Sequence, residues 1–289
     1  MKYSKGKGLG KDSRSMYHLW EFDHVRDVVA LAATNEAPEV SNDWDGNMNL
    51  TKDLGEAIDM FRDGWHDIRD MVDGTLEPLR EELGRILSVE TVRVHDMCGF
   101  EPDIDRYLAG ELECMWDDMM VEAPKDGKVF RMLVDCSMTW NNRPADIAKR
   151  GAALCALVEA CIILGFQMEI WVEHTVKSPT KEEWGTVLAK VCEAGEPMDI
   201  DTTMFVIGHP DFNRRILWAT GELDDVRRET FGFRRGSCYG YCRQGSHYAD
   251  KVGASVVVTL DGNNVLTYKP MDWILDQLEA QGIYSREGE

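Results

Sequence analysis

Three oxygen-bearing side chains stand at alternate positions in the segment Asp135-Cys136-Ser137-Met138-Thr139, directly after the apolar run VFRMLV. In an extended chain, residues at i, i+2 and i+4 point to the same side. Asp135, Ser137 and Thr139 would therefore aim one carboxylate and two hydroxyl groups at one point. Hard divalent cations such as Mg²⁺ prefer oxygen ligands and keep several water molecules. The spacing predicts half of a site for Mg²⁺ or Mn²⁺.

The elements that would position this segment follow an α/β pattern. Short apolar or alternating runs predict strands at residues 129–134, 166–172, 186–191 and 254–260. Longer apolar periodicities predict helices at 143–164, at 201–220 with a break at His209-Pro210, and from 271 onward. This order predicts a mostly parallel, doubly wound sheet covered on both faces. Ligands of such sheets bind beyond the carboxyl ends of strands, where the strand order reverses.

The first part of the chain has a different character. Apolar residues recur at helical spacing over residues 15–33, 54–72 and 76–87, with a loop at 34–49. Residues 1–15 are rich in lysine and glycine and are expected to form a mobile basic tail. The predicted division is therefore a basic flexible tail (1–15), a mainly α-helical region (16–125) and an α/β domain (126–289).

The motif Asp135-x-Ser137-x-Thr139, after a strand and before a long apolar helix, resembles the metal-ion-dependent adhesion site of von Willebrand factor A-like domains. Thr139 replaces the last serine of the family motif and keeps its hydroxyl. The resemblance covers about residues 128–284. It implies a doubly wound α/β fold that binds Mg²⁺ and a partner protein whose acidic residue completes the coordination. Residues 104–115 and 208–217 are also similar to uncharacterised proteins of tailed bacteriophages, which implies phage origin and supplies no activity.

The remainder of the family's metal site is matched in part. The family places a threonine in a later loop, for which Thr202 and Thr203 are candidates outside any recognisable motif. It also places an aspartate after a later strand, and Asp261 is the candidate, although Leu260 interrupts the family's Thr-Asp-Gly sequence. A turn whose hydroxyl groups cap the following helix is the alternative interpretation of residues 135–139.

Two further groups of residues are candidate binding sites. Trp140 directly follows the predicted metal segment and is a candidate anchor for a partner protein. Cys238, Cys242 and His247 stand as C-x3-C-x4-H, and thiolates with imidazole bind Zn²⁺. A structural zinc site needs a fourth ligand, and none stands at a matching spacing. A loop with two incidental thiols is the favoured interpretation.

The pair Arg214-Arg215, which follows His209-Pro210, allows two interpretations. Arginine suits two-point contacts with phosphate or carboxylate. Pairing with acidic neighbours is favoured, because the chain holds 52 Asp and Glu residues.

The charge balance restricts the partners. The 289 residues include 32 Lys and Arg against 52 Asp and Glu, a formal net charge of -20. Such a surface repels phosphate and disfavours general binding to nucleic acid or anionic membranes. No apolar run reaches the roughly 18 residues of a membrane span, and the N-terminus lacks the apolar core of a secretory signal. Cysteines inside apolar runs favour reduced, buried thiols and hence the cytoplasm, of the host cell if the protein is phage-encoded.

The favoured interpretation is a non-enzymatic protein-interaction module in which Mg²⁺ at Asp135, Ser137 and Thr139 is completed by an acidic residue of a partner protein. Three alternatives stay open. The chain could be a partner subunit of an AAA-type ATPase, a Ro-like RNA-associated protein, or a hydrolase or transferase that uses the cleft at the strand ends. For the last, no motif such as G-x-S-x-G gives positive support.

Overall fold

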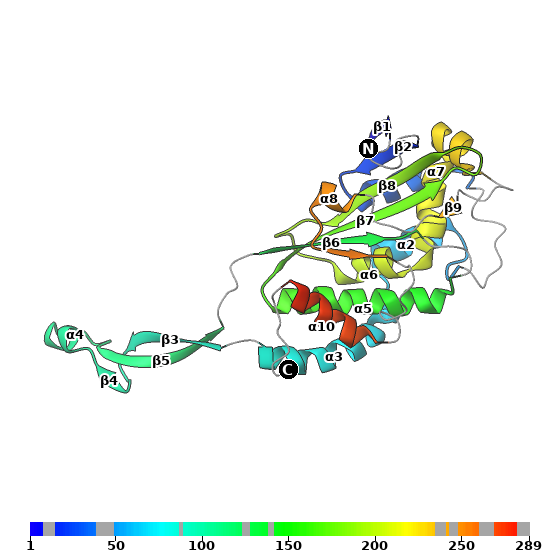
Figure 1. Ribbon diagram of the computed structural model, residues 1–289. Coiled ribbons are helices and arrows are strands. Elements are labelled where there is room, and N and C mark those ends of the chain that lie inside the picture. The colour runs from blue at the N-terminus through cyan, green and yellow to red at the C-terminus, as the bar shows by residue number, and fades with distance from the viewer. Residues whose placement is uncertain are drawn as a thin grey trace.

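The strand that ends at the predicted metal segment, β6 (Val129–Asp135), lies inside the main sheet of the computed structural model (Figure 1). The structure describes residues 1–7, 15–38, 49–86, 89–122, 128–137, 142–234, 241–242, 248–259 and 269–281. The order of the main sheet is β1 (Lys2–Lys7), β2 (Met16–Phe22), β8 (Glu183–Cys192), β7 (Gln167–Lys177), β6 and β10 (Val256–Val258), and β9 (Tyr241–Cys242) also pairs with β7.

The strand order reverses at β6. Helix α5 (Pro144–Ile163) connects β6 to β7, which pairs with β6 in parallel, and β8 follows as an antiparallel neighbour of β7. The chain then returns to the other side of β6, where β10 pairs with it in parallel. The sheet is thus mixed, with parallel and antiparallel pairs of strands. The predicted α/β class is confirmed.

The two faces of the sheet are covered unequally. Phe130, Met132 and Val134 of β6 point into the large core, because alternate residues of a strand face opposite sides. That core also takes in α1 (Val25–Ala32), α2 (Leu54–Asp63), α3 (Arg69–Ile86), α5, α6 (Ile200–Gly208) and α10 (Pro270–Ala280). On the opposite face Leu133 belongs to a small cluster under α8 (Ala249–Val252). Extensive helical cover was predicted for both faces, and in the described residues it is found on one.

Helix α5 confirms the prediction of a helix surrounded on most sides. It packs against the sheet, α3, α6 and α10, and its side chains are buried almost all round. Cys155 and Cys161 are buried there as free thiols, as predicted. The helical segment after residue 200 also breaks where expected, since α6 ends at Gly208 and His209 is extended. A π-helical turn, η4 (Phe212–Leu217), then leads to α7 (Trp218–Glu222) and η5 (Arg227–Phe231).

The helix predicted over residues 15–33 is wrong in its first half, because β2 occupies Met16–Phe22 and only α1 is helical. Strand β2 lies between β1 and β8, so Leu19 is buried on one face of the sheet and Trp20 on the other. The predicted mobile tail is likewise a strand over Lys2–Lys7. The Tyr3 hydroxyl and His18 Nδ1 lie 2.8 Å apart in a hydrogen bond, which joins β1 to β2.

The helix predicted over 54–72 is two helices. Gly64 ends α2 with φ 88°, in the region that favours glycine, and the Trp65 amide donates to the Asp201 carbonyl of α6. The 3₁₀ turn η3 (His66–Ile68) follows, and α3 then runs through Pro78 to Ile86, so it contains most of the helix predicted at 76–87. The loop predicted at 34–49 lies mostly outside the described residues.

A second sheet projects from the body and is named the arm here, residues 89–122 (Figure 1). It contains β3 (Val89–Asp96), β4 (Glu101–Pro102), α4 (Ile104–Leu108) and β5 (Met115–Glu122), with the strand order β3-β5-β4. The prediction of a mainly α-helical region over 16–125 is therefore wrong for the arm. The run VETVRV is rich in β-branched residues, which suit a strand.

The predicted boundary at residue 125 does not separate two cores. Strands β1 and β2 belong to the main sheet, and α1 to α3 belong to the same core as α5. None of the helices in the described part of the chain has the length and apolar character needed to cross a membrane.

Candidate functional site

Asp135 and Ser137 lie together at the carboxyl end of β6, and both are fully buried. Asp135 Oδ1 accepts a hydrogen bond of 2.8 Å from the Ser137 amide, which closes a turn directly after the strand. Ser137 Oγ accepts a hydrogen bond of 2.7 Å from the Thr175 amide of β7. Two of the three residues of the Asp135-x-Ser137-x-Thr139 motif are thus held in place by hydrogen bonds from the main chain. Thr139, like Trp140, lies outside the described residues.

A second carboxylate, which the sequence reasoning missed, lies beside Asp135. Glu173 of β7 is the register partner of Asp135 in the parallel β6–β7 ladder, so both side chains point to the same face of the sheet. Glu173 is 1% exposed, and burial of a carboxylate is costly unless the group is paired or binds a metal. The available signal was a glutamate inside the apolar strand WVEHTV.

Tyr248 lies over this face of the sheet close to Glu173. Burial, assisted by the charge of Glu173, raises the pKa of the Tyr248 phenol to about 12, while a hydrogen bond with Thr186 of β8 opposes the shift. The phenol is therefore a neutral hydrogen-bonding group near Glu173.

On the opposite face, two long polar side chains hold the last carbonyl groups of β6. Arg150 of α5 donates from Nη2 to the Asp135 carbonyl at 2.9 Å, and Asn213 of η4 donates to the Cys136 carbonyl at 2.6 Å. Arg150 is 3% exposed, and its Nε and Nη1 atoms have no hydrogen-bond partner among the described residues. Burial lowers the pKa of Arg150, and the negative charge of Asp135 opposes the shift. Burial also raises the pKa of Cys136 to about 12, so this residue is a thiol and a poor nucleophile.

Arg214 and Arg215 bond to main-chain carbonyls instead of facing an open anion site. Arg214 Nη2 donates to the Asn142 carbonyl at 3.0 Å, and Arg215 Nη2 donates to the Thr51 carbonyl at 2.6 Å. Acidic pairing contributes at longer range, since Arg215 Nε is 4.0 Å from Asp211 Oδ2. The wide π-helical turn lets the consecutive residues Asn213, Arg214 and Arg215 contact three separate segments. Such turns are frequent at functional sites.

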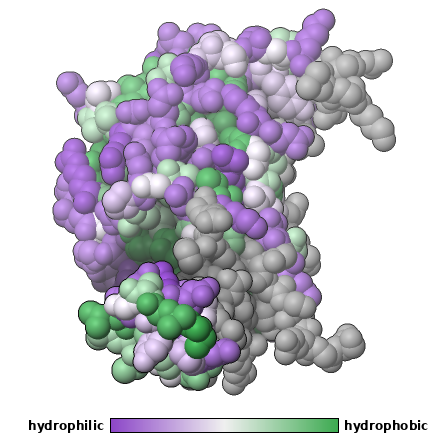
Figure 2. All heavy atoms as spheres, turned by 90° about the vertical axis from the view of Figure 1, so that its left-hand side faces the viewer, coloured by the Kyte–Doolittle hydropathy of each residue, from purple (hydrophilic) through white to green (hydrophobic). Residues whose placement is uncertain are grey.

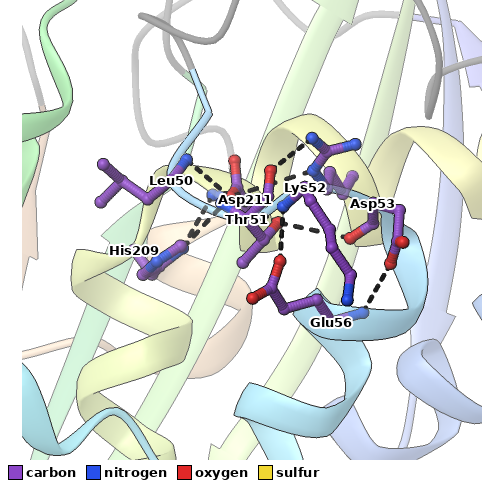
Figure 3. A network of polar contacts seen from close by, with 8 residues as sticks. Leu50, Thr51, Lys52, Asp53, Glu56, His209 and Asp211 are labelled. Atoms are coloured by element: carbon purple, nitrogen blue, oxygen red, sulfur yellow. Dashed lines mark hydrogen bonds and ion pairs between the residues drawn. The ribbon is translucent and has the colours of Figure 1, made fainter.

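Asp211 joins this turn to the segment that precedes α2 (Figure 3). Its Oδ2 atom accepts hydrogen bonds from the Leu50 amide at 2.9 Å, the Thr51 amide at 2.6 Å and the Thr51 hydroxyl at 2.8 Å. Burial raises the pKa of Asp211, and the hydrogen bonds from Thr51 oppose the shift. His209 Nδ1 accepts from the Asp211 amide at 3.1 Å. This network fixes η4 and with it the position of Asn213.

Thr202 lies in the first turn of α6. Its hydroxyl donates to Asp199 Oδ2 at 2.7 Å and to the Phe61 carbonyl at 3.3 Å. The same helix reaches the end of β6 through Val206, whose carbonyl lies 3.8 Å from Cys136 Sγ. The role of Thr202 as a metal ligand stays a prediction.

Most of the other predicted metal ligands are not among the residues that the structure describes. Asp261, Cys238 and His247 fall outside the described residues. Cys242 belongs to β9, which pairs with Val176 and Lys177 of β7. Within the described ranges, no group of three or more His, Cys, Asp or Glu residues has the geometry of a metal site. Any cation at the strand end would therefore need hydroxyl ligands or ligands from outside these ranges.

Comparison with known proteins gives a family and no function. A search of curated proteins and a search of solved structures found no match. A family model described as a domain of unknown function (DUF7192) matches residues 7–282, which include the arm, the helices and every strand of the main sheet except most of β1. The chain therefore belongs to the DUF7192 family.

Proposed function

We propose that this chain is a non-enzymatic protein-interaction module of the von Willebrand A-like type, encoded by a phage and acting in the host cytoplasm. The observation that carries the proposal is the position of Asp135 and Ser137. They follow the strand at which the sheet order reverses, between β7 and β10. In open α/β sheets this position is the common ligand site. The sequence motif that resembles the adhesion site occupies the same position.

The topology around β6 supports the doubly wound assignment. When the two-residue strand β9 is left out and the others are numbered along the chain from β6, the order β8-β7-β6-β10 reads 3-2-1-4, as in the central strands of doubly wound sheets. Helix α5 forms the crossover between the parallel strands β6 and β7. The antiparallel β8 is the departure from a fully parallel sheet.

The residues at the strand end suit a hard cation. Asp135 and Ser137 supply a carboxylate and a hydroxyl, and the second buried carboxylate, Glu173, is adjacent in the ladder. Thr139 and Asp261 are the further ligands that the proposal includes. Mg²⁺ or Mn²⁺ would offset the charge of neighbouring carboxylates in a site with little access to water. When bound, the ion would supply the positive charge that an acidic partner residue needs.

The net charge explains why a metal would be required. A chain of formal charge -20 repels an acidic partner at long range. In the proposed mechanism, Asp135 and Ser137 would hold the ion, while the Thr175 amide orients Ser137 and Arg150 and Asn213 fix the strand end from the other face. The ion would supply the positive charge for the partner's carboxylate, and no covalent step is required.

Thermal unfolding in EDTA, Mg²⁺ and Mn²⁺ tests the metal site. Asp135→Asn keeps an acceptor for the Ser137 amide and removes the charge. Asp59→Asn, on the surface of α2, is the matched control. A cation at 100 times its Kd stabilises the folded state by about 2.7 kcal/mol, which corresponds to a rise in Tm of roughly 5–10 °C for a chain of this size.

The expected result is a metal-dependent rise for the wild type and for Asp59→Asn, and its loss in Asp135→Asn. An equal rise in Asp135→Asn, or no rise in the wild type, would contradict a cation site at the end of β6.

A further inference from the structure

We propose that the tip of the arm, residues 97–112, is a docking surface for a basic amphipathic helix of a partner protein. This surface is separate from the strand end of β6 and goes beyond the function proposed for it. It is carried by the distribution of apolar and charged side chains on the arm.

The tip exposes a cluster of large apolar side chains. None of residues 97–112 is buried. Exposed fractions of 55–81% are found for Met97, Phe100, Ile104, Tyr107, Leu108 and Leu112. Figure 2 views the molecule from the side on which the arm projects, and apolar residues gather there on the part nearest the viewer. Single exposed leucines are ordinary, but a contiguous apolar patch indicates an interaction site.

Polar contacts order the tip. Asp103 Oδ1 caps α4 by accepting from the Asp105 and Arg106 amides at 3.1 and 3.3 Å, and its Oδ2 lies 2.9 Å from His95 Nε2. Arg106 donates to the Glu113 carbonyl at 3.2 Å, which ties α4 to the segment before β5.

The main chain adds further bonds across the tip. The Phe100 amide donates to the Trp116 carbonyl at 2.9 Å, and the Asp103 amide donates to the Cys114 carbonyl at 2.7 Å. The His95 ring also packs on Trp116, with centroids 3.6 Å apart. The apolar side chains therefore stand on a preformed platform, which lowers the cost of ordering on binding.

The negative charge of the arm favours a basic partner. Its acidic residues outnumber its basic residues ten to two: Glu90, Asp96, Glu101, Asp103, Asp105, Glu111, Glu113, Asp117, Asp118 and Glu122 against Arg93 and Arg106. This field repels anionic membranes, nucleic acids and the arm of a second copy. It attracts Lys and Arg. On α4, Ile104, Tyr107 and Leu108 stand at i, i+3 and i+4, which offers an apolar stripe to a partner helix. An apolar helix face flanked by basic residues complements both features.

The test measures peptide binding to the full chain by fluorescence anisotropy, in EDTA. The probe is a labelled helical peptide of about 18 residues, with leucine on one face and lysine elsewhere. One comparison peptide has the same composition in scrambled order, and another has glutamate in place of lysine. The arm variant carries Ile104→Ser, Leu108→Ser and Leu112→Ser. The control carries serine at three apolar surface residues of the body, Ile162, Ile163 and Leu223, which are 42%, 44% and 40% exposed.

The expected result is binding of the amphipathic lysine peptide to the wild type and to the control, with at least about tenfold weaker binding to the arm variant. The double variant Glu101→Gln/Asp105→Asn is expected to weaken binding and its salt dependence while leaving the apolar patch intact. Asp135→Asn is expected to bind normally, which separates this surface from the β6 site. Circular dichroism checks that each variant is folded.

Four outcomes would overturn the proposal. They are no binding of the lysine peptide, equal binding by the folded arm variant, equal binding of the scrambled or glutamate peptide, and a patch that serves another occupant. In the last case, the wild type would form a dimer in sedimentation or bind phosphatidylcholine vesicles. The arm variant would lose that association but would still bind the lysine peptide.

Discussion

The closest approach between helices near the candidate site involves two glycines and permits a quantitative prediction. Gly151 follows Arg150 on α5, and Gly208 is the last residue of α6. A methyl group added at Gly151 would lie 2.3 Å from the Cα atom of Gly208, whereas carbon atoms in contact are separated by about 3.5–4.0 Å. The helices would have to separate by more than about 1 Å to accept Gly151→Ala.

The expected cost of Gly151→Ala combines two opposing effects. Replacing glycine with alanine inside a helix stabilises it by about 1 kcal/mol. Overpacking a close interface costs about 1–3 kcal/mol, and the upper end applies because the obstacle is main chain and cannot rotate away. The net expectation is a loss of about 2 kcal/mol in the free energy of unfolding. Gly74→Ala on α3 is the control, because nothing lies within 4 Å of the added methyl group. This control is expected to gain up to about 1 kcal/mol.

Urea unfolding, followed by tryptophan fluorescence and by circular dichroism, measures both variants. The free energies of unfolding of the two variants are expected to differ by about 3 kcal/mol, although both replace glycine with alanine inside a helix. If Gly151→Ala were as stable as the wild type or as Gly74→Ala, the close contact between α5 and α6 would be refuted. A displaced α5 would also move Arg150 away from the Asp135 carbonyl, so the variant is expected to show a weaker response to Mg²⁺.

Two further predictions concern buried titratable groups. Burial lowers the pKa of His174 and of His209 to about 3, so both stay neutral in the folded chain while the unfolded chain takes up protons below about pH 6.5. The contribution of each histidine to the free energy of unfolding is expected to be fully present above that pH and to fall by up to about 1.4 kcal/mol per pH unit between pH 6.5 and 5. A free energy of unfolding in urea that does not change over this pH range would contradict the prediction. Asp211→Ala would leave the Leu50 and Thr51 amides without their acceptor and is expected to cost about 3 kcal/mol, against less than about 0.5 kcal/mol for the exposed Asp59→Ala. Equal urea midpoints for these two aspartate variants would show that the Asp211 network does not stabilise the fold.

The local sequence pattern was sufficient to predict an element whose own apolar residues show that it is buried. Helix α5 is apolar on most sides, and β6 is a short apolar run that ends in Asp135, so both were predicted with nearly their observed bounds. Strand β2 was predicted as a helix because its apolar residues also fit helical spacing. Its partner β8 lies more than 160 residues later in the chain, as the pairing of Leu19 with Thr186 shows. A contact so remote leaves no local signal.

The sequence by itself determined the chemistry at the end of β6, where Asp135 and Ser137 alternate after an apolar strand, because side-chain direction in a strand depends on position alone. It also determined the acidic character that restricts the partners. Only the tertiary structure decided which other residues meet there. Glu173 reaches Asp135 through strand pairing, Arg150 through the crossover helix, and Asn213 through a π-helical turn. The tertiary structure also holds Thr202 in the first turn of α6, where its hydroxyl bonds to Asp199 and to the Phe61 carbonyl.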